Sequence, residues 1–150
     1  NGLAVKAVRA SLIYGPGTRK GDQRVLNEFV AKGLLGGEIV LMDEGLAKRT
    51  YCYVTDAADM LWRVLLSGKD FVYNVAGESK TSIADLANAI GDYLKVPVII
   101  PVASHAIAEA PENVWLDLTK VKTEFNKTDF IPLDDGLART IEWQKMLYEA

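Results

Sequence analysis

The sequence contains a single cysteine and a single histidine, and this scarcity excludes several kinds of site. Cys52 has no second cysteine to pair with, so the chain can form neither an internal disulfide nor a cysteine-based zinc site. His105 also stands alone, which excludes a cluster of histidine ligands. We therefore expect no metal centre in this chain, and we expect Cys52 to be a structural residue.

The sequence also lacks a strong excess of one charge and lacks any long apolar run. Its formal net charge is −3, which gives no electrostatic basis for binding nucleic acid. No stretch is apolar over the length of a membrane span, and no signal-peptide pattern is visible at its start, so we expect no membrane partner. The cytoplasm is the compartment expected by default.

The residues that are present favour one α/β domain. The 150 residues, of which 49% are hydrophobic, are enough for a substantial core. Apolar residues recur at helical spacing in some segments and form short runs in others. The expected helices are 23–35, one that begins at Thr55, 82–94, one that begins at Thr119 and one from about Leu133. The expected strands are 4–13, 38–42, 49–54, 71–77, 96–100 and 113–118, with an irregular loop over 102–112. Helices and strands alternate, which is typical of the α/β class.

The first of these strands carries apolar residues on both of its faces. Val5, Val8, Leu12 and Ile13 occupy both parities, which favours a strand buried on both faces in a parallel sheet. Because a parallel strand needs a partner and no start pattern precedes it, we expect the chain to be the second part of a longer protein.

Local chemistry predicts how two other strands connect. Asp43, Glu44 and Gly45 have turn composition and lie between the strands 38–42 and 49–54, so they predict the tip of a hairpin.

Capping chemistry predicts where two helices begin. Thr55 is the expected cap of the second helix, with Asp56 and Asp59 in its first turn, where the helix dipole favours carboxylates. Ser82 and Asp85 form a variant of the capping box before the third helix. The expected buried stripe of the second helix is Met60, Leu61, Val64 and Leu65, and that of the third is Ile83, Leu86, Ala87, Ile90 and Leu94.

The stretch "IYGPGTRKGDQR" raises the question of a nucleotide-binding loop. Gly15, Gly17 and Gly21 follow an apolar strand and precede a helix, but their spacing is G-x-G-x-x-x-G rather than the dinucleotide fingerprint G-x-G-x-x-G. The alternative is a Gly/Pro turn that ends a strand.

Five groups of residues follow one another in an order that carries a family resemblance. They are "VRASLIYGPG", "DQRVLNEFVAKGL", "EGLAKRTYCYVTDAADML", "FVYNVAGESKTSIADLANAI", and "WLDLTKVK" followed by "DDGLARTIEW". In this order and spacing they resemble the carboxyl-terminal half of the extended short-chain dehydrogenase/reductases, which are NAD-dependent nucleotide-sugar epimerases, dehydratases and decarboxylases. The resemblance covers nearly all of residues 4 to 146.

The resemblance implies a longer full-length protein whose first half holds a Gly-rich cofactor loop and a catalytic Tyr-x-x-x-Lys pair. Neither is expected here, because no tyrosine of this chain is followed by lysine four positions later. The resemblance therefore implies that residues 15 to 21 form the loop after a late sheet strand. This chain is then expected to contain no catalytic residue and no assigned cofactor-binding residue.

Arg49 is the first substrate-binding candidate that the resemblance implies. It resembles the arginine of the family stretch G-D-G-x-x-x-R-x-F-x-Y-V-x-D, which contacts the diphosphate of a sugar nucleotide. A guanidinium stays charged and can bind two phosphate oxygens at once. Asp43 stands where that stretch has its first glycine, so the preceding turn departs from the family. The alternative for Arg49 is a solvated cation at a strand edge.

Arg24 is the second candidate. "DQRVLNEF" resembles the D-G-R-x-x-x-x-F stretch of UDP-glucuronate decarboxylases, whose arginine also lies near the diphosphate. An anion would remove the cost of placing a cation at a helix N-terminus and would also bind the free N–H groups there. The alternative is a surface cation.

Tyr14, Ser11 and His105 complete the substrate-binding candidates. Tyr14 and Ser11 lie on the strand whose end faces the active site in the family, although Leu12 stands where the family usually has Asn or Ser. His105 lies in the loop that would flank the sugar nucleotide. Asp56 and Asp59 resemble a catalytic pair, but first-turn carboxylates have a structural explanation, which we favour.

One further departure concerns the diphosphate. The family commonly has an arginine directly before a proline as a second clamp, whereas this chain has Ala110 before Pro111. Either another cation replaces it or the substrate is unusual.

These observations predict the substrate-binding half of an NAD-dependent nucleotide-sugar epimerase, dehydratase or decarboxylase. Residues 4–22 would be a late strand and loop of a Rossmann-type parallel sheet, and residues 23–150 mostly the substrate-binding portion of the same domain. UDP-glucuronate decarboxylases are the subgroup most similar to it. NAD would serve the full-length enzyme, and the isolated chain would be inactive. The alternatives are a non-enzymatic module that binds a protein partner and a reductase of the same superfamily. We also expect the isolated chain to self-associate through residues 4–13.

Overall fold

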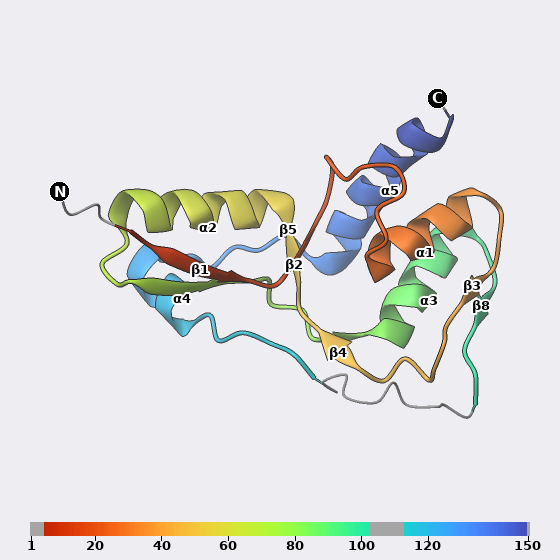
Figure 1. Cartoon of the computed structure of the whole chain (residues 1–150), viewed down its shortest axis with the longest axis horizontal. Helices are drawn as coiled ribbons and strands as arrows, with labels where there is room; N and C mark the ends of the chain where they lie inside the picture. Colours follow the sequence, from red (N-terminus) through yellow and green to blue (C-terminus); the bar gives the residue numbers. More distant parts are fainter. Residues whose placement is uncertain (1–4, 103–112, 150) are drawn as a thin grey trace.

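The computed structural model describes residues 5–102 and 113–149 and has the expected α/β composition. The strands are β1 (Ala7–Ala10), β2 (Leu12–Tyr14), β3 (Ile39–Val40), β4 (Lys48–Arg49), β5 (Tyr51–Tyr53), β6 (Val72–Val75), β7 (Thr81–Ser82) and β8 (Val98–Ile99). The helices are α1 (Val25–Leu34), α2 (Val54–Ser67), α3 (Ile83–Leu94), α4 (Thr119–Phe125) and α5 (Leu133–Glu149). Figure 1 shows an elongated molecule with β1, β6, α2 and α4 at one end and α1, α3 and α5 at the other.

The N-terminal strand segment pairs with two different partners in succession. β1 pairs in parallel with β6, and β2 pairs in parallel with β5. The change of partner occurs at Ser11, whose backbone N–H donates to Val75 O, while the N–H of Leu12 donates to Thr50 O. The expected strand 4–13 is therefore two short strands joined at one residue. Its parallel pairing agrees with the prediction, but the expected burial on both faces is wrong for this chain, since Val8 and Leu12 are exposed.

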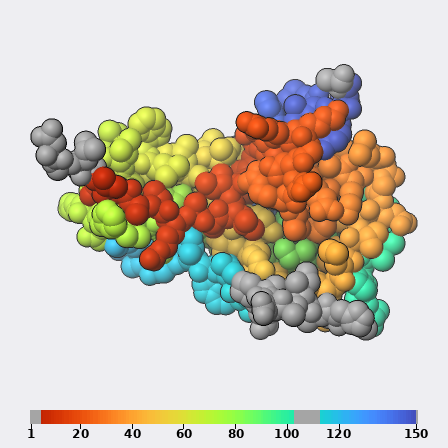
Figure 2. Space-filling view, viewed as in Figure 1, coloured from red at the N-terminus to blue at the C-terminus, as the bar shows by residue number. Residues whose placement is uncertain are grey.

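The two ends of the molecule have separate hydrophobic cores. At the first end, α2 and α4 pack with β6 around one shared core, which includes Met60, Val64, Tyr73, Val121 and Phe125. The Arg63 side chain of α2 donates to Phe125 O at the end of α4. At the second end, α1, α3 and α5 pack around a core that contains Phe29, Val30, Leu86, Ile90 and Ile141. Figure 2 shows α1 and the segment after it, in orange, covering one face of this second end, with α5 in blue beside them.

The expected hairpin at residues 43–45 is wrong. β3 pairs in parallel with β8, and β4 pairs antiparallel with β7, so the two strands do not meet. The turn itself forms, since Asp43 Oδ1 accepts a hydrogen bond from the N–H of Gly45. The chain then runs past the start of α3, where Gly45 O accepts from the N–H of Ala84 and Ala47 O from the N–H of Ile83. These contacts hold it away from β3.

The expected strand 113–118 is also wrong. Only Asn113 forms a β-bridge, with Lys48, and the following residues are irregular within the described part of the chain. They are held by single contacts instead, such as the bond from Asn74 Nδ2 to Asp117 O. Nearly all of the expected loop 102–112 lies outside the described residues.

The second helix differs from its prediction in its start and in its buried face. α2 begins at Val54 with Tyr53 at the capping position, so Thr55 is not the cap, and Asp59 lies beyond the first turn. Met60 and Val64 are buried as expected. Leu61 and Leu65 are 41% and 65% exposed, because the β1–β6 pair meets a narrower stripe of α2 than the apolar pattern predicted.

The other helix predictions are confirmed. Ser82 caps α3, since its Oγ accepts a hydrogen bond from the N–H of Asp85. The stripe Leu86, Ala87 and Ile90 is fully buried, with Ile83 and Leu94 packed against the same core. α4 begins at Thr119 and α5 at Leu133, as the sequence predicts.

A buried ion pair joins α2 to the segment between α4 and α5. Lys127 Nζ lies 2.9 Å from Asp56 Oδ1, and both side chains are more than 90% buried. The other carboxylate oxygen of Asp56 accepts from the N–H of Ile131 at 2.8 Å. Burial acts to lower the pKa of Lys127, but the hydrogen bond and charge of Asp56 outweigh it and raise the pKa above its usual value. The structural role expected for Asp56 is therefore supported by its own contacts.

Replacing Lys127 with methionine should destabilise the chain by about 3–5 kcal/mol, because it leaves the Asp56 carboxylate buried without its cation. Urea unfolding followed by circular dichroism measures this loss. Asp70→Asn is the control, since Asp70 forms an exposed ion pair with Lys120 and its loss should leave stability unchanged. Equal effects of the two substitutions would contradict a central role for the buried pair.

The exposed edge of β1 should make the isolated chain self-associate. β6 is the one strand that pairs with β1 in the described ranges, and Val5, Val8 and Leu12 are 60%, 36% and 40% exposed. Unpaired edges with apolar side chains favour pairing with another chain. We expect light scattering across a concentration series to show oligomers, and Val8→Lys to reduce them.

Leu66→Lys is the matched control, because Leu66 is 78% exposed on α2 rather than on β1. Loss of oligomers with this variant alone would move the contact to α2. A monomer at every concentration, whatever residue stands at position 8, would show that the half-enzyme interpretation of residues 4–13 is wrong.

Candidate functional site

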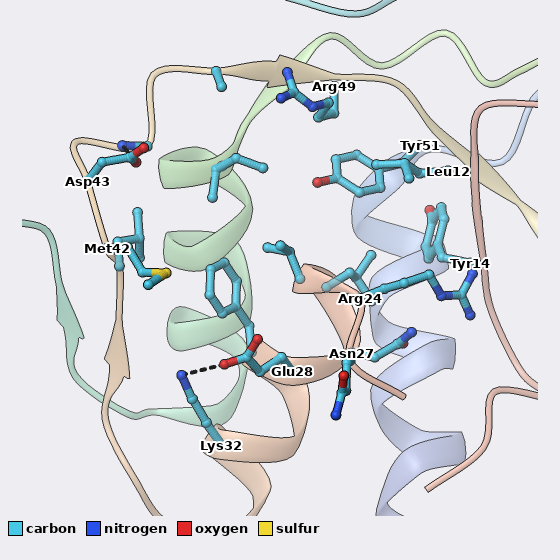
Figure 3. Close-up of a pocket in the computed structure, with 18 of the residues that line it drawn as sticks. Leu12, Tyr14, Arg24, Asn27, Glu28, Lys32, Met42, Asp43, Arg49 and Tyr51 are labelled. Atoms are coloured by element: carbon cyan, nitrogen blue, oxygen red, sulfur yellow. Dashed lines mark hydrogen bonds and ion pairs between the residues drawn. The ribbon is translucent and has the colours of Figure 1, made fainter. Parts of the chain in front are cut away.

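A cavity of about 770 Å³ lies between α1, the β2–β5 pair and the segment that follows β3. Apolar side chains make up much of its wall, and Arg24 and Arg49 lie among them (Figure 3). The residues come from distant parts of the chain, so the cavity exists only in the folded state. Its walls include Leu12, Tyr14, Val25, Leu26, Leu41, Met42, Leu46, Tyr51 and Ile83.

The amphipathic pattern of α1 explains its place in the wall. Phe29 and Val30 face the core, while Glu28 and Lys32 lie on the exposed side and form an ion pair of 2.7 Å. These two residues line the cavity, as Figure 3 shows. Their opposite charges compensate each other, so neither supplies a net charge to the site.

Arg24 lies directly before α1 and is fixed by two partners. Its Nε and Nη2 donate to the carboxylate of Asp22, and its Nη1 donates to Ile13 O at 2.9 Å. The hydrogen bond from Arg24 lowers the pKa of Asp22 well below its usual value. The guanidinium is half exposed, so it can still meet a ligand while its position is set.

Arg49 enters the same cavity from β4. Its Nη1 donates to Lys48 O at 2.9 Å, and the side chain is partly buried. The structure thus brings together Arg24 and Arg49, which are separated by 24 intervening residues in the sequence. Two guanidinium groups in one largely apolar cavity suit a ligand that has an anionic part and an apolar or aromatic part.

Tyr14 lines the cavity but its hydroxyl is turned toward α5. The hydroxyl donates to Leu133 O at 3.4 Å, and the ring packs edge-on against Tyr51 and Tyr53. Gly136 of α5 approaches so closely that an added Cβ would overlap the Tyr14 hydroxyl. Burial raises the pKa of Tyr14 well above its usual value, so the group stays protonated. Its substrate-binding role stays a prediction.

Of the other two substrate candidates, the structure describes Ser11 alone. Ser11 is not part of the cavity wall, and its buried Oγ has no hydrogen-bond partner in the part of the chain that the structure describes. His105 falls outside the described residues.

Sequence reasoning missed Tyr51. The pattern assigned this residue to a strand, but it lies in the cavity wall beside Arg49 and is 4% exposed. The sequence had no means of showing that its ring faces the cavity, because β5 is buried on both sides. Cys52, the next residue, is fully buried, and burial raises the pKa of its thiol to about 12, which fits the structural role expected for it.

The glycine loop makes contacts of its own at its first residues. An added Cβ on Gly15 would lie 2.6 Å from Val54, so this glycine permits close packing against α2. The Thr18 hydroxyl donates to Gly15 O, and Trp143 Nε1 donates to Thr18 O at 3.3 Å. The loop is therefore closed on itself and tied to α5.

Residues 5–102 and 113–149 contain neither a metal-binding cluster nor a helix that could span a membrane. No three side chains of Asp, Glu, Cys or His gather closely enough there to hold a metal ion. No helix of these segments combines the length and the apolar character that a membrane span requires.

Comparison with known proteins gives one family. Residues 1–76 match the family described as the NAD dependent epimerase/dehydratase family. UDP-glucuronic acid decarboxylase 5 of Arabidopsis thaliana is 24% identical over 137 residues, which cover 91% of this chain and 40% of that protein. dTDP-4-dehydro-6-deoxy-D-allose reductase of Streptomyces bikiniensis is 33% identical over 144 residues, which cover 95% of this chain and 44% of that protein.

A solved structure confirms the fold. UDP-glucuronic acid 4-epimerase from Bacillus cereus, in complex with UDP-glucuronic acid and NAD, superposes with a TM-score of 0.82 at 20% identity, covering 95% of this chain and 46% of that one. The α/β fold expected from the sequence is thus confirmed as that of the Rossmann-like epimerases and dehydratases. The chain spans less than half the length of these proteins.

Proposed function

The chain belongs to the NAD dependent epimerase/dehydratase family, and we propose that it binds the nucleoside diphosphate end of a nucleotide-sugar. The observation that carries the proposal is that Arg24 and Arg49 both line one cavity with largely apolar walls. Apolar walls accommodate the base and ribose, and arginines bind phosphate oxygens bidentately.

The start of α1 adds to this site. Val25, Leu26 and Asn27 line the cavity, and their N–H groups belong to the first turn of a helix, where backbone donors favour an anion. Arg24 at the cap of the same helix is positioned by Asp22, which offsets part of its charge, so in this proposal the helix N–H groups and the exposed part of the Arg24 side chain act together on one phosphate group. This arrangement favours a phosphate-binding role for Arg24 over the alternative of a surface cation.

The acidic residues of the wall oppose anion binding less than their number indicates. Asp43 is engaged by the N–H of Gly45, and Glu28 is paired with Lys32. The charge of Glu28 is therefore compensated before a ligand binds, whereas Glu44 also lines the wall and opposes an anion. We assign the two arginines to the diphosphate. They would replace the second arginine that the family commonly has where this chain has Ala110.

Two reactions are candidates for the full-length protein. Decarboxylation of a UDP-linked uronic acid is favoured by the stretch "DQRVLNEF" around Arg24 and by the similarity to UDP-glucuronic acid decarboxylases. The dTDP-sugar reductases, which have the higher identity of 33%, favour reduction of a dTDP-linked keto sugar. Both reactions require a hydride carrier, and the epimerase complexed with NAD supports NAD in this role.

The cofactor belongs, in this proposal, to a part of the full-length protein outside these residues. Residues 15–21 are closed by their own contacts and do not fit a dinucleotide. The 150 residues alone are then inactive, and their contribution is to hold and orient the substrate.

The first test is calorimetry of the isolated chain with three ligands. We expect saturable binding of UDP or dTDP and no binding of NAD, because the cavity suits a nucleoside diphosphate and the glycine loop does not suit a dinucleotide. Tighter binding of UDP supports the decarboxylase-like function, and tighter binding of dTDP the reductase-like function. Binding of neither would overturn the proposal, and saturable binding of NAD would assign residues 15–21 to the cofactor.

The second test is Arg49→Ala. Loss of one charged contact to the diphosphate should weaken nucleotide binding by about 2–4 kcal/mol. In the full-length enzyme the loss should raise KM more than it lowers kcat, because the diphosphate changes little in the transition state. Arg63→Ala is the control, since Arg63 is paired with Asp59 on α2 and does not line the cavity. An unchanged affinity in Arg49→Ala would make Arg49 a surface residue.

A further inference from the structure

The hydroxyl of Tyr51 is a buried polar group without a partner. The side chain is 4% exposed, its oxygen is shielded from solvent, and no described residue forms a hydrogen bond with it. Buried polar groups are nearly always paired, and an unpaired one destabilises the fold. Its presence in the wall of the cavity therefore calls for a specific explanation.

The position of Tyr51 is fixed from several sides. Its backbone N–H donates to Ser79 Oγ at 3.1 Å, and Gly77 approaches so closely that an added Cβ would overlap Tyr51 O. Within β5 it lies opposite Leu12 of β2, and its ring meets the ring of Tyr14 edge-on at 6.2 Å. The position of the hydroxyl is thus fixed, so it cannot move easily to reach another hydrogen-bond partner.

This fixed hydroxyl lies next to Arg49. Arg49 and Tyr51 are two positions apart in the sequence and both line the cavity. The positive charge of Arg49 opposes the effect of burial on the pKa of Tyr51. Figure 3 shows the Tyr51 hydroxyl directed toward the interior of the pocket, with Arg49 close by. Burial is the larger effect and raises the pKa of Tyr51 to about 12, so the group remains a neutral O–H donor at physiological pH.

We propose that the Tyr51 hydroxyl is a second hydrogen-bond donor to the diphosphate of the ligand, beside Arg49. The inference rests on the proposed function, because it needs an anionic ligand in this cavity. A phosphate oxygen bound by Arg49 would lie within the region that the neighbouring hydroxyl can reach. Since the oxygen is shielded in the unliganded chain, binding requires a small shift of a wall side chain, which the new hydrogen bond offsets. Tyr51 is then a binding residue whose missing partner is the ligand itself.

This role makes an unusual pair of predictions for Tyr51→Phe. A donor to a charged oxygen contributes enough that its loss should weaken binding of UDP, or of dTDP if that ligand binds more tightly, by about 10- to 100-fold. The unliganded variant should melt at the same temperature or up to about 4 °C higher, because a buried hydroxyl without a partner is removed. Calorimetry and thermal unfolding of the 150-residue chain measure the two effects.

Tyr73→Phe is the matched control. Tyr73 is also a buried strand tyrosine, but its hydroxyl accepts from the N–H of Asp70 and donates to Glu124, and it does not line the cavity. We expect this variant to melt at a lower temperature and to bind the nucleotide as the unmodified chain does. The two substitutions remove the same atom, so the contrast isolates the role of its surroundings.

The outcomes separate the two proposals. Nucleotide binding that is equal in Tyr51→Phe and in the unmodified chain overturns the role of Tyr51 and leaves the proposed function standing. Weaker binding accompanied by a lower melting temperature also counts against the role, because a hydroxyl without an internal partner has no internal contact to lose. Failure of the unmodified chain to bind either nucleoside diphosphate overturns both proposals.

Discussion

The parallel pairing of β2 with β5 is the contact on which both cores of the molecule depend. Side chains alternate across a strand, so each of these strands faces both ways. Tyr14, Tyr51 and Tyr53 point into the core formed by α1, α3 and α5, whereas Ile13 and Cys52 pack against the core of α2 and α4. Two strands of three residues each therefore form the wall between the two cores. All three residues of β5 are buried for this reason.

The candidate site depends on the same wall. Tyr14 and Tyr51 form part of the cavity surface, and one residue, Thr50, separates Arg49 from the start of β5. Arg24 reaches back from the start of α1 to bind Ile13 O on β2. Both arginines are thus positioned by their attachment to the β2–β5 pair, and not by each other. The distance between them is set by the strands before any ligand binds, which favours pre-organised binding.

Much of the fold could be predicted from the sequence because it is encoded locally. The Ser82 cap, the buried stripe of α3 and the starts of α4 and α5 follow from residues only a few positions apart. The prediction of a hairpin at 43–45 was wrong because a turn does not determine whether the strands before and after it pair with each other. Lys48 and Arg49 pair with β7, more than thirty residues later. The predicted burial of Leu61 and Leu65 was wrong for a related reason. An apolar pattern does not show how much of a helix surface is covered by the elements that pack on it.

For the candidate site, the structure shows where the predicted residues lie, and their binding roles stay predictions. The motifs placed Arg24 and Arg49 among the substrate residues, and the structure lines one cavity with both. The motif order, and not any local property of the two arginines, carried that information. Tyr51 was not among the candidates, because a sequence pattern cannot show that its buried hydroxyl has no partner among the described residues. Asp56 was correctly given a structural role, but its partner Lys127, 71 positions away, was not foreseen.

A wall shared by two cores has a consequence for how the chain unfolds. Unfolding of either core removes the packing on one side of β2 and β5. These strands are also the wall of the other core, so that core is destabilised as well. The two ends of the molecule are consequently expected to melt together, in a single cooperative transition, although their hydrophobic clusters are separate. Local opening at one end would also deform the cavity at the other, so thermal fluctuation of α2 is coupled to the shape presented to a nucleotide.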